Sequence, residues 1–197
     1  MQSVSLTAVS PDKLALQFCG RTGIPYRHLD EVSCRTANWF RSLGLRSGDH
    51  IALMSENRPD LVELCWGAQR SGLYYTLIPT HLRADEAAYI ADDCGARLVA
   101  TTARHAALWR SNRRSLPKVE HWACLDAAPD FSLIGQEVER QRTEPIEPEV
   151  EGSAMLYSSG TTGRPKGIKR ALSGKPFGQE PLSSIYRQHH NMDENTV

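Results

Sequence analysis

Residues 154–170 read AMLYSSGTTGRPKGIKR, and this stretch decides what fold and function the sequence predicts. Its first residues, 154–157, are apolar or aromatic and predict a strand. Six hydroxyl or glycine residues and a lysine follow, namely Ser158, Ser159, Gly160, Thr161, Thr162, Gly163 and Lys166. Because the N–H groups of such a loop can converge on one anion, the composition indicates phosphate binding. We expect a strand–loop–strand phosphate-binding motif over 153–171, and the alternative is an ordinary flexible surface loop.

The residues around the lysine differ from a Walker A loop, which needs Gly-Lys-Ser/Thr and a helix behind the phosphates. Here Lys166 follows Pro165, and the proline disfavours helical backbone at Arg164. Gly167 and the β-branched Ile168 are also poor residues for a first helical turn. We therefore expect the loop to join two strands, and a small P-loop NTPase is the less favoured interpretation.

Upstream of this motif, helical and strand-like patterns alternate along the chain. The expected helices cover 28–43, 59–70, 84–94, 103–113 and 132–141. The expected strands cover 49–54, 73–78, 97–101, 119–125 and 154–157. This alternation predicts βαβ units, and hence an α/β fold with a mostly parallel sheet and flanking helices over residues 1–152.

Two segments lack any periodic pattern. Residues 143–152, TEPIEPEVEG, hold two prolines and four glutamates, so we expect an exposed linker that packs no core. Residues 172–197 form a polar tail, for which we expect disorder or contacts with partners outside the chain.

Composition limits the partners. Lys plus Arg equals Asp plus Glu at 23 each, so the formal net charge of zero gives no support for nucleic-acid or anionic-membrane binding. Hydrophobic residues make up 40% of the 197 residues, which is typical of a soluble globular protein. The N-terminus carries no signal-peptide pattern and no apolar run is long enough for a transmembrane helix, so we expect a cytoplasmic protein.

The five cysteines are expected to be free thiols, most of them buried. They stand far apart at Cys19, Cys34, Cys65, Cys94 and Cys124, and no Cys-x-x-Cys pair occurs. This spacing supports neither a zinc site nor a redox motif. We expect no metal site.

The motif YSSGTTGRPKG, residues 157–167, resembles the signature of the adenylate-forming superfamily, which includes the acyl-CoA synthetases and other AMP-binding enzymes. The upstream sequence is similar to the N-terminal sequence of these enzymes, most clearly in GDHIAL at 48–53 and NRPDLVELCWGAQRSG at 57–72. The resemblance covers about residues 10–171 and is greatest to fatty-acid and other carboxylate–CoA ligases. It implies that the chain is part of their large N-terminal domain. The sequence that follows, GIKRALSGKPFG at residues 167–178, differs from the sequence that is more common in the family at this place.

The resemblance also implies a chemistry. In this superfamily a carboxylate attacks the α-phosphate of ATP, pyrophosphate leaves, and a thiol, usually that of CoA, displaces AMP from the acyl-AMP. By resemblance, Thr161, Thr162, Gly163 and Lys166 would hold the β- and γ-phosphates with Mg²⁺. Ser158, Ser159 and Gly160 would shape the turn. ATP, Mg²⁺ and CoA are thus the expected cofactors and co-substrates, and a carboxylic acid is the expected substrate.

The superfamily's later motifs do not occur in these 197 residues. They include the adenine-binding stretch, an Asp that binds the ribose and the lysine of the small C-terminal domain. We therefore expect no catalytic residue here, and we expect this N-terminal fragment not to complete adenylation alone. The alternative is a non-catalytic nucleotide-binding or interaction module from a shortened gene. Part of a domain would also leave apolar surface uncovered, which favours oligomers.

Overall fold

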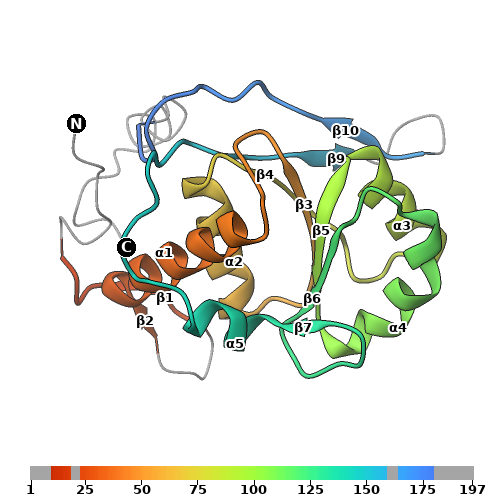
Figure 1. Ribbon diagram of the computed structural model, residues 1–197, viewed down its shortest axis with the longest axis horizontal. Coiled ribbons are helices and arrows are strands. Elements are labelled where there is room, and N and C mark those ends of the chain that lie inside the picture. Colours follow the sequence, from red (N-terminus) through yellow and green to blue (C-terminus); the bar gives the residue numbers. More distant parts are fainter. Residues whose placement is uncertain (1–9, 19–22, 159–163, 180–197) are drawn as a thin grey trace.

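A six-stranded parallel sheet forms the centre of the protein, in a computed structural model that describes residues 10–18, 23–158 and 164–179 (Figure 1). The strand order is β7-β6-β5-β3-β4-β8, and every neighbouring pair is parallel. The strands are β3 (His50–Met54), β4 (Tyr74–Leu77), β5 (Ala96–Thr101), β6 (His121–Cys124), β7 (Ser132–Leu133) and β8 (Ser153–Ala154). The expected mostly parallel α/β fold is confirmed.

Helices cover both faces of this sheet (Figure 1). One face carries α1 (Tyr26–Ser42), α2 (Pro59–Arg70) and α5 (Ile134–Glu139), and the other carries α3 (Ala84–Asp93) and α4 (Ala103–Asn112). Successive side chains of a strand point to opposite faces. Ile51 and Leu53 of β3 therefore join the core under α1 and α2, and Ala52 and Met54 join the core under α3 and α4. All five residues of β3 are buried, as expected for a strand covered on both sides.

Further short elements lie outside this sheet and its helices. Near the N-terminus, β1 (Leu14–Leu16) pairs antiparallel with β2 (Ile24–Pro25). A 3₁₀ turn, η2 (Arg113–Ser115), follows α4. None of the helices formed by the described residues is long and apolar enough to cross a membrane.

The predicted elements agree with the observed ones except at two places. The helix predicted over 132–141 begins with a strand, because Ser132 and Leu133 extend the sheet by pairing with Ala123 and Cys124 before α5 starts. The strand predicted over 154–157 is interrupted at Met155. Residues before it pair with β4, and residues after it form β9 (Leu156–Ser158), which pairs with β10 (Lys166–Ile168).

The segment 143–152 is packed against the domain, so the expectation that it packs no core is wrong. Ile146 is 1% exposed. The carboxylate of Glu149 lies 3.1 Å from Nε of Arg70, and this pairing makes burial of the acidic side chain tolerable. The N–H of Gly152 donates to the carbonyl of Gln69 at 2.6 Å. A buried apolar residue, an ion pair and backbone hydrogen bonds thus together hold a segment that is largely polar.

The first part of the predicted tail is also packed. Phe177 is 2% exposed and meets the Trp66 ring edge-on at 5.8 Å between centroids. Pro176 forms an antiparallel bridge with Val150, and the N–H of Glu151 donates to the carbonyl of Lys175 at 2.9 Å. Residues 172–179 are therefore packed on the domain and are not disordered. Residues 180–197 lie outside the described part of the chain.

Four of the five cysteines fall in the described residues, and all four are free thiols. Cys34, Cys94 and Cys124 are buried and Cys65 is partly buried. Burial raises the pKa of Cys34 and of Cys94 to about 11. These thiols therefore behave as small apolar side chains of the core.

Candidate functional site

The two ends of the predicted phosphate-binding loop meet in an antiparallel hairpin. Strands β9 and β10 pair with Lys166 opposite Ser158, Gly167 opposite Tyr157 and Ile168 opposite Leu156. The hydroxyl of Ser158 donates to the carbonyl of Lys166 at 3.5 Å. Of the seven predicted site residues, the structure thus brings Ser158 and Lys166 together. The other five, Ser159, Gly160, Thr161, Thr162 and Gly163, lie outside the described residues.

The lysine begins a strand. Lys166–Ile168 form β10, so the expected strand–loop–strand arrangement is present at the described ends of the loop. A Walker A lysine would lie in the first turn of a helix, and that geometry is absent here. The structure therefore contradicts the Walker A arrangement on which the P-loop NTPase interpretation depends.

The two faces of the hairpin have different surroundings. Residues directly opposite each other in an antiparallel pair share a face. Ser158 and Lys166 therefore project to the same side and both are exposed. On the other side, the hydroxyl of Tyr157 donates to a carboxylate oxygen of Asp93 in α3 at 2.6 Å. The face with Ser158 and Lys166 also carries the exposed side chains of Leu156 and Ile168, and it is presented to solvent. The opposite face is fixed on α3.

Gly167 lies close to the side chains of Met155 and of Tyr157 on the partner strand. A Cβ atom at residue 167 would lie 2.3 Å from the terminal methyl of Met155 and 3.1 Å from the ring of Tyr157. Separations this short require the neighbours to move. A side chain at 167 would therefore displace the flexible end of Met155 and crowd the Tyr157 ring.

A second contact with α3 fixes the end of the loop. The hydroxyl of Tyr89 donates to the carbonyl of Pro165 at 3.3 Å. The guanidinium of Arg164 lies over the same ring, 5.2 Å from its centroid. This cation–π contact places a positive charge two residues before Lys166.

The charge at the loop is positive and accessible. The Lys166 ammonium makes no ion pair with the residues that the structure describes. Because no carboxylate neutralises it, it is available to a ligand with several negative charges. None of the described residues form a group of three or more His, Cys, Asp or Glu side chains that could hold a metal ion.

Beyond β10 the chain is anchored on the sheet. The ammonium of Lys169 donates to Nε2 of His50 at 2.9 Å and lies 4.3 Å from the centroid of the Tyr74 ring. The hydroxyl of Tyr74 donates to the carbonyl of Arg170 at 2.7 Å. Burial, and then the charge of Lys169, lower the pKa of His50 to about 4, so the imidazole is neutral and accepts this bond near pH 7.

These anchoring residues were not found from the sequence. Tyr74, Tyr89 and Asp93 stand more than sixty residues before the hairpin, and each has an ordinary role in its own strand or helix. Local patterns do not indicate which distant segment such a side chain contacts. The one available signal was the position of Tyr157 in a predicted strand, which requires some surface to cover its ring.

A family model described as AMP-binding enzyme matches residues 6–171, which is most of the chain. The chain belongs to the AMP-binding enzyme family. The expected resemblance is thereby confirmed, and residues 156–168 of the hairpin lie within the matched range.

Relatives in this family include CoA ligases. The chain is 33% identical over 177 residues to a crotonobetaine/carnitine–CoA ligase of Salmonella paratyphi A, and the match covers 83% of this chain and 34% of that protein. The crotonobetaine/carnitine–CoA ligase of Salmonella enteritidis is 31% identical over 179 residues, again covering 83% of this chain and 34% of the relative. The chain therefore spans about a third of the length of the curated relatives that it matches.

Solved structures agree with this placement. The fold matches the anthranilate CoA ligase AuaEII, solved with anthranoyl-AMP, at a TM-score of 0.75 and 27% identity, over 84% of this chain and 33% of that one. A putative long-chain-fatty-acid CoA ligase from Rhodopseudomonas palustris gives a TM-score of 0.78 over 94% of this chain and 46% of that one. Its identity is 21%, so this second likeness concerns the fold alone. Both matches confirm the α/β fold of the N-terminal portion of such enzymes.

Proposed function

We propose that this chain is the ATP-binding N-terminal portion of a carboxylate–CoA ligase. Its hairpin loop would hold the pyrophosphate part of ATP while a carboxylate attacks the α-phosphate. The thiol of CoA would then displace AMP from the acyl-AMP and give the thioester. The observation that carries the proposal is the placement of Ser158 opposite Lys166, at the two ends of a loop of sequence SGTTGRP.

The chemistry of the hairpin supports a role in holding the leaving group. Negative charge accumulates on pyrophosphate as the bond to the α-phosphorus breaks, so a fixed cation and hydroxyl donors stabilise that state. Lys166 would supply the cation, and its partner strand is held by the Tyr157–Asp93 hydrogen bond. Ser158, Ser159, Gly160, Thr161, Thr162 and Gly163 would supply hydroxyl and backbone donors.

Mg²⁺, which neutralises phosphate charge when it is bound with ATP, would come with the nucleotide. The described residues provide no group of carboxylates fit to hold it, and we assign no step to it. The acyl substrate stays open within the class of carboxylic acids. A role in fatty-acid metabolism in the cytoplasm is part of the proposal, because the resemblance to acyl-CoA synthetases suggests it.

Titration of the chain with pyrophosphate and with ATP tests the proposal. We expect Lys166→Ala to weaken the binding of both, because a hydrogen bond to a charged group contributes about 1.5–3 kcal/mol, or about ten- to a hundredfold in Kd. Lys175→Ala is the matched control, because Lys175 is also exposed but lies outside the hairpin. Circular dichroism would show that both variants keep the fold.

The outcomes separate the alternatives. Equal, weak binding by the wild type and Lys166→Ala would favour a non-catalytic interaction module. Hydrolysis of ATP without any carboxylate would favour an NTPase. We expect the 197-residue chain to show no carboxylate-dependent ATP–pyrophosphate exchange, and detection of that exchange would contradict the fragment part of the proposal.

A further inference from the structure

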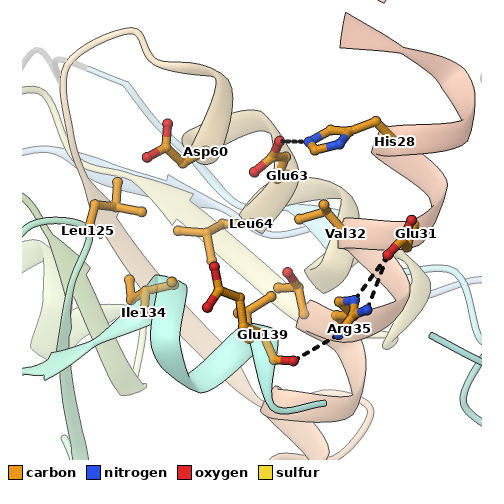
Figure 2. Close-up of a pocket in the computed structure, with 13 residues that line it drawn as sticks. His28, Glu31, Val32, Arg35, Asp60, Glu63, Leu64, Leu125, Ile134 and Glu139 are labelled. Atoms are coloured by element: carbon orange, nitrogen blue, oxygen red, sulfur yellow. Dashed lines mark hydrogen bonds and ion pairs between the residues drawn. The ribbon is translucent and has the colours of Figure 1, made fainter. Parts of the chain in front are cut away.

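A cavity of about 480 Å³ lies between α1, α2 and α5 (Figure 2). These helices cover one face of the sheet, whereas the β9–β10 hairpin packs on α3 at the other face. No residue of the hairpin lines the cavity. A ligand in this cavity would therefore occupy a site separate from the phosphate-binding loop.

The floor of the cavity is apolar. Leu64 of α2 is 2% exposed, and Ile134 and Val138 of α5 are 3% and 7% exposed. Leu125, which follows β6, completes this surface. Cavities of about 300–1,000 Å³ with apolar walls and a few polar groups are typical of small-molecule sites, and this one has that size and composition.

The rim of the cavity is acidic. Four carboxylates line it, from Glu31, Asp60, Glu63 and Glu139. Two of them are neutralised by arginines: Arg35 binds Glu31 at 3.2 Å, and Arg58 binds Asp60 at 2.7 Å. The remaining bonds of Arg35 go to the backbone carbonyls of Glu139 and of residue 141, both at 2.8 Å. Four hydrogen bonds thus direct the guanidinium towards Glu31 and these two carbonyls, and it makes no ion pair with the side chain of Glu139.

Two carboxylates are left with little or no positive charge. Glu63 meets only His28, at 3.2 Å, and His28 is charged only when it is protonated. The carboxylate of Glu139 makes no ion pair with any described residue. In Figure 2, Leu64 is seen between Glu63 above it and Glu139 below it. Negative charge therefore flanks the apolar floor.

The environment of Glu63 favours an added cation. Its side chain is 16% exposed. Burial raises the pKa of Glu63, the charge of Asp60 raises it further, and His28 acts in the opposite direction. A positive group beside this carboxylate would offset the cost of keeping it ionised away from water. A bare metal ion does not fit, because no group of three or more His, Cys, Asp or Glu side chains in the described residues could hold one.

We propose that this cavity binds a small organic cation, with an alkylammonium group between Glu63 and Glu139 and its apolar chain on Leu64, Ile134 and Val138. The ammonium complements the two carboxylates that lack a full partner, and the chain covers the apolar floor. Neither half of the arrangement depends on the phosphate-binding loop, so the inference is independent of the proposed function.

Calorimetric titration of the full chain with three six-carbon ligands tests the proposal. n-Hexylammonium carries the required charge, hexanol is its neutral counterpart and hexanoate is its anionic counterpart. We expect saturable binding of hexylammonium with a Kd of about 1 mM or tighter, binding of hexanol at least about tenfold weaker, and no binding of hexanoate. Equal binding of hexylammonium and hexanol, or no saturable binding of hexylammonium, would overturn the proposal.

Near-isosteric variants locate the charge. Glu63→Gln and Glu139→Gln should each weaken hexylammonium binding about tenfold, because each removes one carboxylate that has no arginine or lysine partner among the described residues. Glu144→Gln is the matched control, since Glu144 is exposed and lies outside the cavity. An equal loss in all three variants would show diffuse surface attraction and overturn the proposal. Lys166→Ala should leave hexylammonium binding unchanged, so a failure here is distinguishable from a failure of the pyrophosphate site.

Discussion

Nε of Arg70 lies 3.1 Å from a carboxylate oxygen of Glu149, and the two side chains are only 2% and 5% exposed. The same guanidinium binds the carboxylate of Asp30 at 2.7 Å and lies 5.0 Å from the centroid of the Phe177 ring. One buried arginine of α2 thus joins α1, the segment 143–152 and residues 176–179. These segments are distant in the sequence, and Arg70 is a common contact of all three.

Loss of Arg70 should be costly. Arg70→Met would remove the cation that pairs with Glu149 and Asp30, and breaking a buried ion pair on one side costs about 3–5 kcal/mol of unfolding free energy. Urea denaturation, monitored by circular dichroism, measures this loss of unfolding free energy. Arg140→Met is the control, because its pair with Glu137 is largely exposed and should contribute less than about 1 kcal/mol. Similar losses in both variants would contradict the assigned role of Arg70.

Gly152 should accept no larger residue. A Cβ atom there would lie 2.5 Å from the carbonyl oxygen of Leu73 and 2.7 Å from that of Ala68. Both are backbone atoms that cannot rotate away, so we expect Gly152→Ala to lower the unfolding free energy by about 1–3 kcal/mol. Gly135→Ala serves as the control, since a Cβ at Gly135 meets nothing within 4 Å. Thermal unfolding measures the stability of the two variants. An unchanged stability of Gly152→Ala would show that the space between Gly152 and these carbonyl oxygens is larger than described.

The hydrogen bond between Tyr157 and Asp93 should matter for both stability and ligand binding. Tyr157→Phe removes it and should cost about 1 kcal/mol of stability. We also expect weaker pyrophosphate binding, because the strand that faces Lys166 would lose its fixed position. Tyr26→Phe is the control, because Tyr26 lies at the start of α1 and outside the hairpin. A Tyr157→Phe variant with unchanged pyrophosphate affinity would show that α3 does not position the loop.

Stability should fall in mild acid because of His50. The imidazole has an ordinary pKa of 6.5 and a folded-state pKa of about 4. Between these values the unfolded chain binds more protons than the folded one, so the folded state loses stability as the pH falls from 6.5 towards 4. The loss from this group is at most about 3 kcal/mol, and above pH 6.5 the group contributes no pH dependence.

Substitutions at two positions isolate this effect. His50→Gln should flatten the dependence of unfolding free energy on pH between 6.5 and 4. Lys169→Met should flatten it in part, because the ammonium of Lys169 is the second cause of the lowered pKa. Urea titrations at several pH values provide the measurement. The same slope in the wild type and His50→Gln would show that other groups produce the acid sensitivity.

The sequence alone predicted much of the architecture. Helix α2 has the predicted bounds of 59–70, because Pro59 suits a first helical turn and Leu64 and Ala68 form one apolar stripe. The strand after the loop was predicted as well, because Pro165 and Gly167 disfavour a helix there, whereas its antiparallel pairing with β9 was not predicted. Local backbone preferences and periodicity were sufficient for both.

The contacts between distant segments were not predicted. The acidic sequence of 143–152 did not predict that Glu149 would form an ion pair with Arg70, or that Ile146 would be buried. Phe177 likewise stands in a polar stretch, and its burial depends on a surface formed by Trp66 and Arg70. Such contacts follow from the assembled fold. The roles of Ser159, Gly160, Thr161, Thr162 and Gly163 stay predictions.

The pairing of β8 with β4 has a consequence for the order of folding. Tyr74 is bonded in register with Ser153, so this last strand of the sheet joins a partner from far earlier in the chain. Pairing across such a long separation has a high entropic cost, and it is repaid only when most of the intervening structure has formed. During synthesis on the ribosome, the hairpin with Lys166 would therefore be assembled late. The affinity for nucleotide that we propose for this hairpin would then arise only after the sheet was complete.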